Sequence, residues 1–262
     1  MKILVCVKQV PGSSKVEVDP ETGVLKRSGV KSKINPYDLY AIEAALRLRE
    51  DVGGTVDCIT MGPPQARAVI EETVAMGARR GTVMSDRKFA GADVLATAYT
   101  LSSGIKRLGD FDVILCGKQT TDGDTAQVGA ETAEFLGIPN VAGVTSIDGY
   151  RDGELFLKAT LDGTVTELAV RTPCLISMDG DVNTPRLPSY KIKKAIPEDA
   201  VSFIGFDDLD DRDESHYGLS GSATKVERIF PPEKNEEKHE LCGSPAEQAS
   251  GILSLLLDKK LI

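Results

Sequence analysis

Short apolar runs alternate with helix-like stripes through the first half of the chain. The runs at 2–8, 56–61, 82–85 and 112–116 predict buried strands, because polar residues, glycine or proline stop each of them. The stretches between them predict helices that open at Asn35, cover 65–76 and 93–108, and begin again near Asp124. This repeated strand-then-helix order predicts an α/β fold with a mostly parallel sheet and helices on both faces.

The pattern changes after Gly137, where strand-like runs follow one another with no helical stripe between them. These runs lie at 144–147, 155–159, 164–171 and 175–178, with turns expected at 148–149 and 162–163. They predict antiparallel structure, either added to the same sheet or packed beside it. A further hairpin is expected near the start, where 16–18 and 24–25 flank a turn at 19–23.

The last part of the chain is charged and differs from the rest. An acidic run at 207–214 and a charged linker at 231–240 precede a helix start, in which Ser244, Pro245 and Glu247 form a capping box. We therefore divide the chain into an α/β domain over 1–204 and an arm over 205–262. The apolar stripe of the last helix needs a surface to cover it. That surface is either the chain's own domain or, as we favour, a partner subunit.

Composition narrows the possible classes of protein. The chain has 262 residues, 41% of them hydrophobic and 27% charged, which is typical of a globular protein. Its net charge of −9 repels a phosphate backbone and argues against nucleic-acid binding. A nucleotide remains possible, because backbone N–H groups bind phosphate without basic side chains. No run approaches the ~20 apolar residues of a membrane span, and the first apolar run is too short for a signal sequence, so we expect a cytoplasmic protein.

The side chains that usually carry chemistry are few. The five cysteines are widely spaced, and we interpret Cys6, Cys58 and Cys116 as buried thiols in a reducing compartment. The two histidines lie in charged sequence near the end, which argues against a zinc site or a histidine-based triad. No nucleophile stands beside a base. Any chemistry is therefore expected to belong to a bound cofactor.

The segment 117–129 is the strongest candidate for binding that cofactor. It joins the end of a predicted strand to a helix start, which is where ligands bind in parallel α/β sheets. Gly117 and Gly123 allow close approach, three threonines add hydroxyls, and Asp124 could cap the helix with Gln127 reaching back. Such a loop suits a pyrophosphate, although it lacks the glycine and serine pattern of a P-loop. The alternative is an ordinary capped loop.

Two further helix starts are candidates. At Asn35 the residues suit capping, with Pro36 at the first helical position and Asp38 in the first turn. This segment either contributes to the site or simply caps its helix. The second start, at 89–97, carries small residues that would admit a ligand or would serve close packing.

Several multi-residue stretches, in the right order along the whole chain, resemble the beta subunit of electron-transferring flavoproteins. They are Val7 to Pro11, Ile34 to Asp38, Met61 to Ala66, Ala75 to Ala78, Gly117 to Gly129 and Asn183 to Arg186. The resemblance implies an adenine-nucleotide α-hydrolase-like fold. It also implies a heterodimer with an alpha subunit that carries its own FAD on a mobile domain, with the C-terminal arm wrapping that partner.

The resemblance also implies site residues. The nucleotide contacts fall on Cys6, Asn35, Pro36, Tyr37, Asp38, Met61, Gly117, Lys118, Gln119, Thr120, Thr121, Asp122, Gly123, Asp124, Thr125, Ala126, Gln127 and Val128, and Asp93 and Thr97 would help to hold a flavin. Thr120-Thr121 replaces the usual Ala-Ile pair. The partner-binding residues would be Leu187, Ile252, Leu253 and Leu256. Leu187 would anchor a partner dehydrogenase, or else belong to a plain surface loop, because its loop is shorter than in many relatives.

Beta subunits of this family are of two kinds, and the chain is more similar to the electron-bifurcating kind. That kind binds FAD, takes hydride from NADH, and passes electrons singly to the alpha-subunit FAD and to a low-potential carrier such as ferredoxin. The first alternative is a subunit with structural AMP that relays electrons from acyl-CoA dehydrogenases. The second is an adenine-nucleotide-binding module with no redox role.

Overall fold

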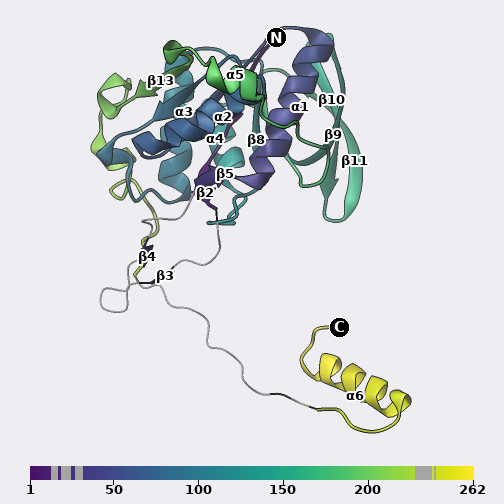
Figure 1. Ribbon diagram of the computed structural model, residues 1–262. Coiled ribbons are helices and arrows are strands. Elements are labelled where there is room, and N and C mark those ends of the chain that lie inside the picture. Colours follow the sequence, from purple (N-terminus) through teal and green to yellow (C-terminus); the bar gives the residue numbers. More distant parts are fainter. Residues whose placement is uncertain (13–16, 19–24, 27–31, 228–237, 239) are drawn as a thin grey trace. The chain divides into compact units, whose positions relative to one another are not determined.

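The computed structural model describes residues 1–12, 17–18, 25–26, 32–227, 238 and 240–262 (Figure 1). The chain divides into two compact units, Met1–Glu227 and Arg228–Ile262. The first unit contains a nine-stranded sheet with the order β11-β10-β9-β12-β8-β1-β6-β7-β13, counted over the described residues. Its parallel strands are β1 (Lys2–Cys6), β6 (Thr55–Met61), β7 (Arg80–Met84), β8 (Val113–Gly117), β12 (Cys174–Met178) and β13 (Val201–Ile204).

Strand β1 lies in the middle of the parallel strands, with β6 on one side and β8 on the other. Val5 is in register with Cys58 on β6 and with Leu115 on β8. The chain builds β6 and β7 outward on one side of β1 and then returns to place β8 on the other side. The order therefore reverses between β1 and β8. In open parallel sheets this reversal leaves a crevice at the carboxyl ends of the two strands.

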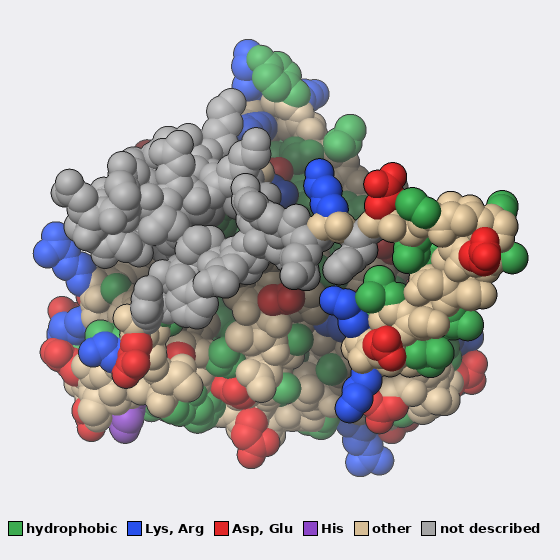
Figure 2. Space-filling view, turned by 90° about the horizontal axis from the view of Figure 1, so that it is seen from below, with side chains coloured by type: hydrophobic (Ala, Val, Ile, Leu, Met, Phe, Trp, Pro, Cys, Tyr) green, Lys and Arg blue, Asp and Glu red, His purple; other side chains and the backbone are tan. Residues whose placement is uncertain are grey.

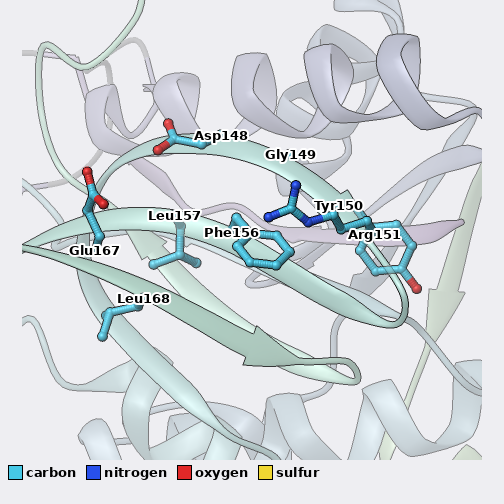
Figure 3. A pocket seen from close by; sticks show the side chains of 8 residues that line it. All are labelled: Asp148, Gly149, Tyr150, Arg151, Phe156, Leu157, Glu167 and Leu168. Atoms are coloured by element: carbon cyan, nitrogen blue, oxygen red, sulfur yellow. The ribbon is translucent and has the colours of Figure 1, made fainter.

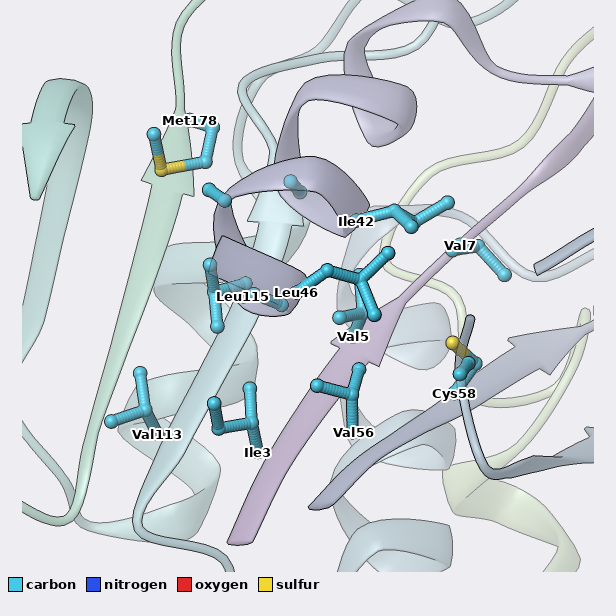
Figure 4. Close-up of a cluster of buried hydrophobic side chains, with 14 of the residues drawn as sticks. Ile3, Val5, Val7, Ile42, Leu46, Val56, Cys58, Val113, Leu115 and Met178 are labelled. Atoms are coloured by element: carbon cyan, nitrogen blue, oxygen red, sulfur yellow. The ribbon is translucent and has the colours of Figure 1, made fainter. Parts of the chain in front are cut away.

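Four helices cover the two faces of the sheet: α1 (Pro36–Val52), α2 (Arg67–Met76), α3 (Val94–Leu108) and α4 (Val128–Leu136). Because side chains alternate along a strand, Ile3 and Val5 pack with α1 and α2, as Figure 4 shows for α1, while Leu4 packs with α3 and α4. All three side chains are 0% exposed. The predicted parallel sheet with helices on both faces is confirmed.

The antiparallel strands form one side of the sheet. They are β9 (Asn140–Arg151), β10 (Glu154–Leu161) and β11 (Thr164–Arg171). The turn predicted at 162–163 is confirmed, but the one predicted at 148–149 is wrong, because this pair lies inside β9 next to an irregular stretch of pairing. The chain turns at 152–153 instead, where Asp152 and Gly153 have positive φ.

Two parallel strands were not recognised as such from sequence. β12 is parallel to both β8 and β9, although no helical stripe precedes it. This is possible because the antiparallel strands β10 and β11 return the chain to the end of the sheet at which β9 begins. β13 is a short strand parallel to β7. Both examples show pairing that sequence periodicity alone did not reveal.

In the described part of the chain, four short strands pair outside the main sheet. β2 (Gln9–Pro11) pairs with β5 (Ser32–Ile34), and the predicted hairpin is present as β3 (Glu17–Val18) paired with β4 (Leu25–Lys26). The predicted turn of that hairpin, at 19–23, lies outside the described residues, as do the predicted strand residues at positions 16 and 24. In Figure 1 the chain begins at the mark N and runs down to β2, so the carboxyl ends of the parallel strands face the bottom of the view.

The first unit extends beyond the boundary predicted after residue 204. Phe206, Leu209 and Tyr217 are buried in the cluster on the α3 and α4 face, so the acidic segment packs on the domain up to Glu227. Short helices occur at Pro64–Ala66, Arg87–Phe89, Glu198–Ala200, Phe206–Asp208, Glu214–His216 and, as α5, Tyr190–Lys194. In the second unit α6 (Pro245–Asp258) begins with the predicted capping box of Ser244 and Glu247. Among the described residues, no helix is long and apolar enough to cross a membrane.

Candidate nucleotide-binding site

The candidate site lies at the carboxyl ends of β1 and β8, where Cys6 and Gly117 are the last strand residues. Figure 2 looks at the molecule from this end, and charged side chains of both signs are visible around the part of the face that is described. Helices α3 and α4 follow strands β7 and β8 of this sheet, and α1 follows β5, which pairs with β2 just after β1. The structure therefore brings the two segments selected from sequence, 35–38 and 117–128, to one place.

The Asp38 carboxylate connects the two central strands at this edge. Its Oδ2 accepts a hydrogen bond of 2.7 Å from the backbone N–H of Lys8, just after β1. Its Oδ1 accepts bonds of 2.9 Å from Nδ2 of Asn35 and 3.2 Å from the backbone N–H of Gly117. The side chain is only 3% exposed. Asp38 is thus held by three N–H donors that all belong to its own chain.

Asn35 continues this network into the loop after β8. Its Nδ2 also donates to the carbonyl of Gln119 at 2.8 Å, and its Oδ1 accepts from the N–H of Thr121 at 3.2 Å. Asn35 occupies the N-cap position of α1, as predicted, but its side chain makes no capping hydrogen bond to the helix. It bonds the neighbouring loop instead, because that loop supplies both a donor and an acceptor within reach.

Glycine is required where α1 approaches β8. A Cβ at Gly117 would lie 2.5 Å from Oδ1 of Asp38 and 2.6 Å from the backbone carbon of Tyr37, which is closer than real contacts allow. At Gly129, in the first turn of α4, a Cβ would lie 2.7 Å from Sγ of Cys116. The small residues seen in the sequence therefore serve close packing around the site.

Burial changes the titration of the groups in this crevice. It raises the pKa of Asp38 to about 7, although the hydrogen bonds from Asn35, Lys8 and Gly117 act in the opposite direction. Burial also raises the pKa of the Cys6 thiol and takes that of Cys116 to about 12. The prediction of buried thiols is correct for Cys58, but Cys6 and Cys116 are only half-buried. Their partial exposure is consistent with a place at the rim of a site.

The loop after β8 is tethered at its base and exposed beyond it. Nζ of Lys118 lies 3.1 Å from Asp179, and Nζ of Lys8 lies 2.7 Å from Asp122. Residues 121–127 are exposed, and Asp124 and Ala126 have φ of 55° and 57°. Such positive φ values at residues other than glycine are uncommon and occur mostly in specialised turns.

Helix α4 begins later than predicted. It starts at Val128 rather than near Asp124, and Gln127 at its N-cap position makes no side-chain capping bond. Asp124 does not cap the helix, because its carboxylate accepts a hydrogen bond from Nε2 of Gln119 instead. The Gln127 side chain therefore accepts no hydrogen bond from the first N–H groups of α4. Free N–H groups at a helix start favour an anion.

The start of α3 differs, because its N–H groups are already capped. Oδ1 of Asp93 accepts from the N–H of Ala96 at 3.1 Å, and Oδ2 accepts from the N–H and Oγ1 of Thr224 at 2.8 and 3.0 Å. Asp93 was expected to hold a flavin, but both carboxylate oxygens are occupied within the chain. Thr97 lies one turn further along and is half-buried.

Sequence reasoning missed one carboxylate in this region. Burial and then the charge of Asp93 raise the pKa of Glu131, which lies in the first turn of α4. Oε2 of Glu131 is buried and has no hydrogen-bond partner among the described residues. An acidic residue in the first turn of α4 was the feature of the sequence that could have indicated Glu131.

The residues at this edge fit an adenine-nucleotide cofactor. The helix start at Val128 offers N–H groups, a Cβ at Gly123 would have no atom nearer than 3.5 Å, and Cys6, Met61 and Cys116 provide a half-buried apolar rim. Met61 ends β6, beside β1. A backbone that can bind phosphate beside an apolar rim suits a phosphate group next to a planar ring.

The residues predicted to bind partners lie elsewhere. Leu187 is 89% exposed in the loop before α5, and Arg186 beside it is paired with Glu43 and Glu50 of α1. Ile252 and Leu253 are 50% and 51% exposed on α6, and Leu256 is half-buried. Leu187 belongs to the first unit, and the three α6 residues belong to the second.

A separate hollow of about 430 Å³ lies over the antiparallel strands (Figure 3). Arg151, whose guanidinium stacks 4.1 Å from the ring centre of Phe156, and Leu157 line part of it. None of the residues predicted to bind a cofactor contributes to this hollow.

These features define a class: an α/β domain with a nucleotide-type site at the reversal point of its sheet. The chain matches the family model described as the electron transfer flavoprotein domain over residues 22–203. It is 40% identical to the electron transfer flavoprotein subunit beta of Thermoanaerobacterium thermosaccharolyticum, over 100% of both chains. It is 38% identical to the caffeyl-CoA reductase-Etf complex subunit CarD of Acetobacterium woodii, again over 100% of both, and 40% identical to protein FixA of Azorhizobium caulinodans, over 91% of this chain and 87% of the relative.

The chain therefore belongs to the electron transfer flavoprotein family, among its beta subunits. This membership confirms the family resemblance inferred from the motifs. It also argues against the alternative of a nucleotide-binding module without a redox role.

Proposed function

We propose that the chain is the beta subunit of an electron-bifurcating flavoprotein and binds FAD at the ends of β1 and β8. In complex with an alpha subunit, the protein would oxidise NADH and pass electrons singly to the alpha-subunit FAD and to a low-potential acceptor such as ferredoxin. A bound flavin would supply the redox chemistry, and this chain would bind and orient that flavin. The proposal depends most on one contact. Nδ2 of Asn35 donates a hydrogen bond of 2.8 Å to the carbonyl of Gln119, and this bond joins segments 35–38 and 117–128.

The half-buried rim supports a cofactor larger than a mononucleotide. Met61 and Cys6 leave apolar surface at the ends of β6 and β1, and Thr97 in the first turn of α3 is half-buried. The loop N–H groups and the start of α4 would bind the phosphates. Lys118, Thr120, Thr121 and Thr125 would add polar contacts at the exposed edge. A relative named as part of a caffeyl-CoA reductase-Etf complex also favours association with a dehydrogenase.

Counting the released nucleotides tests the proposal. The chain is co-expressed with its alpha subunit, the complex is purified and denatured, and flavin and adenylate are separated and quantified. Two FAD per heterodimer, together with NADH oxidation, supports the bifurcating function. One FAD and one AMP without NADH oxidation would establish the alternative subunit with structural AMP. Neither nucleotide at the beta site would refute both.

We propose further that the second unit binds the alpha subunit through the apolar face of α6. The exposed Ile252 and Leu253 and the half-buried Leu256 need a partner surface. Deletion of 244–262 is expected to weaken association of the subunits, measured by sedimentation or calorimetric titration. A matched control replaces the charged Lys259 and Lys260 by Ser. Unchanged affinity in the deletion would contradict the proposal.

A second partner surface is proposed at Leu187, for a dehydrogenase. Its side chain is 89% exposed, and Tyr190 and Ile192 of α5 add exposed apolar area beside it. Leu187→Asp is expected to reduce electron transfer to the partner dehydrogenase while leaving NADH-dependent flavin reduction intact. An equal loss of both activities would argue against a docking role.

A further inference from the structure

Asn35 and Asp38 are placed where a cofactor contact was expected, yet their side chains are directed into their own chain. They are 0% and 3% exposed, and their polar atoms bond Lys8, Gly117, Gln119 and Thr121, as well as each other. Every one of these outer partners is a backbone group. The pair therefore joins the chain after β1, the start of α1 and the loop after β8.

We propose that Asn35 and Asp38 are positioning residues that set the conformation of the 117–121 loop for the cofactor's phosphates without contacting the cofactor. This inference rests on the proposed nucleotide function and deepens it. Two buried side chains, on the side of the loop that faces away from the ligand, would thus determine the affinity for the phosphate part of the ligand. The adenosine part would be bound independently of them.

Apart from the exposed ion pairs of Lys118 with Asp179 and of Lys8 with Asp122, few other contacts hold the loop. The N–H of Lys118 donates to the carbonyl of Met178, and the N–H of Asp124 donates back to Thr120 within the loop. Between these bonds, Asn35 supplies partners for both the carbonyl of Gln119 and the N–H of Thr121. Loss of Asn35 or Asp38 would leave backbone groups without partners and allow the loop to shift. A displacement of about 1 Å is enough to impair a positioned site.

The ionisation of Asp38 gives this arrangement a pH signature. The titratable groups around it are Cys6 and Lys8 from the β1 end, Cys58 from β6 and Cys116 from β8. Burial raises its pKa to about 7. Below that pH one carboxylate oxygen becomes a donor and can no longer accept from the N–H groups that point at it. Retention of a phosphate-bearing ligand is therefore expected to weaken as the pH falls from 8 to 6.

The stability of the ligand-free protein is expected to change in the opposite direction. Because the folded pKa of about 7 lies above the ordinary value of 3.8, the folded state binds more protons than the unfolded state between these values. The unfolding free energy contributed by this group therefore falls as the pH rises from about 4 to 7. A merely structural role for Asp38 would make ligand retention and stability change together.

The test uses the full chain in complex with its alpha subunit, stripped of the beta-site nucleotide. Binding of FAD, AMP and adenosine is measured by calorimetry for wild type, Asp38→Asn, Asn35→Ala and the control Glu167→Gln, which removes an exposed ion pair with Lys158 on the antiparallel strands, outside the site. We expect the first two variants to bind FAD and AMP about 10- to 100-fold more weakly, since each leaves buried polar groups unpaired. Adenosine binding should change less than about threefold, and the control should resemble wild type.

The result that overturns the inference is unchanged binding of FAD and AMP in both variants, or an equal loss for adenosine. If a variant fails to fold, wild-type binding between pH 6 and 8 decides: affinity for AMP that falls at lower pH while adenosine affinity stays constant supports the inference, and parallel changes overturn it. Failure of wild type to bind any of the three ligands would instead refute the proposed function.

Discussion

The site has two halves that are built in different ways. The inner half, made of Asn35, Asp38 and Gly117, is buried and its polar atoms are bonded within the chain. The outer half, residues 121–127, is exposed and leads into a helix start that has no side-chain cap. The inner half is therefore held by hydrogen bonds within the chain, whereas the outer half exposes groups that a ligand could bind. A binding site needs both, because a prearranged base reduces the ordering cost of binding.

The two helix starts beside the site show the same contrast. At α3 the Asp93 carboxylate caps the helix and also bonds Thr224 of the segment before the second unit. At α4 the N-cap residue Gln127 makes no such bond. The chain thus completes one helix start itself and leaves the other for an anion. Asp93 thus bonds its own chain through both carboxylate oxygens, and its contact with a cofactor stays a prediction.

Substitutions of two glycines, one in each half, are expected to give the largest difference in unfolding free energy. Gly117→Ala is expected to cost about 3 kcal/mol of unfolding free energy, because its Cβ would meet Asp38 and the backbone of Tyr37 at 2.5 and 2.6 Å. Gly123→Ala is the matched control, with no neighbour closer than 3.5 Å, and should cost less than about 0.5 kcal/mol. Denaturant unfolding measures both. Similar costs for the two would mean that the halves do not differ in packing.

Substitutions at the starts of α3 and α4 are expected to have an effect of intermediate size on the unfolding free energy. Asp93→Ala removes a cap and the bonds to Thr224, and should cost about 1–2 kcal/mol. Hydrogen exchange of the backbone in 217–227 should also accelerate. Gln127→Ala is expected to leave stability nearly unchanged, since its side chain caps nothing. If Gln127→Ala lowered the unfolding free energy more than Asp93→Ala, the capped helix start would be that of α4 and not that of α3.

The smallest effect is expected at the exposed link between the halves, where Nζ of Lys8 lies 2.7 Å from Asp122. Burial raises the pKa of Asp122, but the hydrogen bond and charge of Lys8 outweigh it, so its pKa lies below the ordinary value of 3.8. A lowered pKa means that the pair stabilises the fold above about pH 4 and loses this effect as the pH falls further. Asp122→Asn should cost less than about 1 kcal/mol at pH 7, and less still in high salt. A loss independent of salt and pH would point to a packing role.

Much of the fold follows from local pattern. The strands at 2–8, 56–61, 82–85 and 112–116, and the helices between them, were predictable because their apolar residues follow periods that suit a buried strand or a half-buried helix. Glycines mark the helix ends at Gly77 and Gly109, where both have positive φ. The turn at 148–149 was predicted wrongly because Asp-Gly is a turn pair by preference, yet here Gly149 lies opposite Phe156 in a bulged strand.

Predictions about individual site residues were less secure than the location of the site. The start of α4 shifted from Asp124 to Val128 because Gln119 takes up the carboxylate expected to cap the helix. The acidic segment after 204 was assigned to an arm because of its charge, although Phe206 and Tyr217 pack it against α3. Both errors arose from partners that are distant in the sequence.

The sequence by itself determined the alternation of strands and helices, the family, and the two segments that meet at the sheet edge, because periodicity, glycine and motif order are local properties of the chain. Only the tertiary structure decided which side chains remain available there. Asn35, Asp38 and Asp93 all carry groups that could bind a ligand, but backbone atoms from remote segments bond them first. Whether a polar group is free depends on which segments the fold brings within hydrogen-bonding distance of it, and no local pattern encodes that.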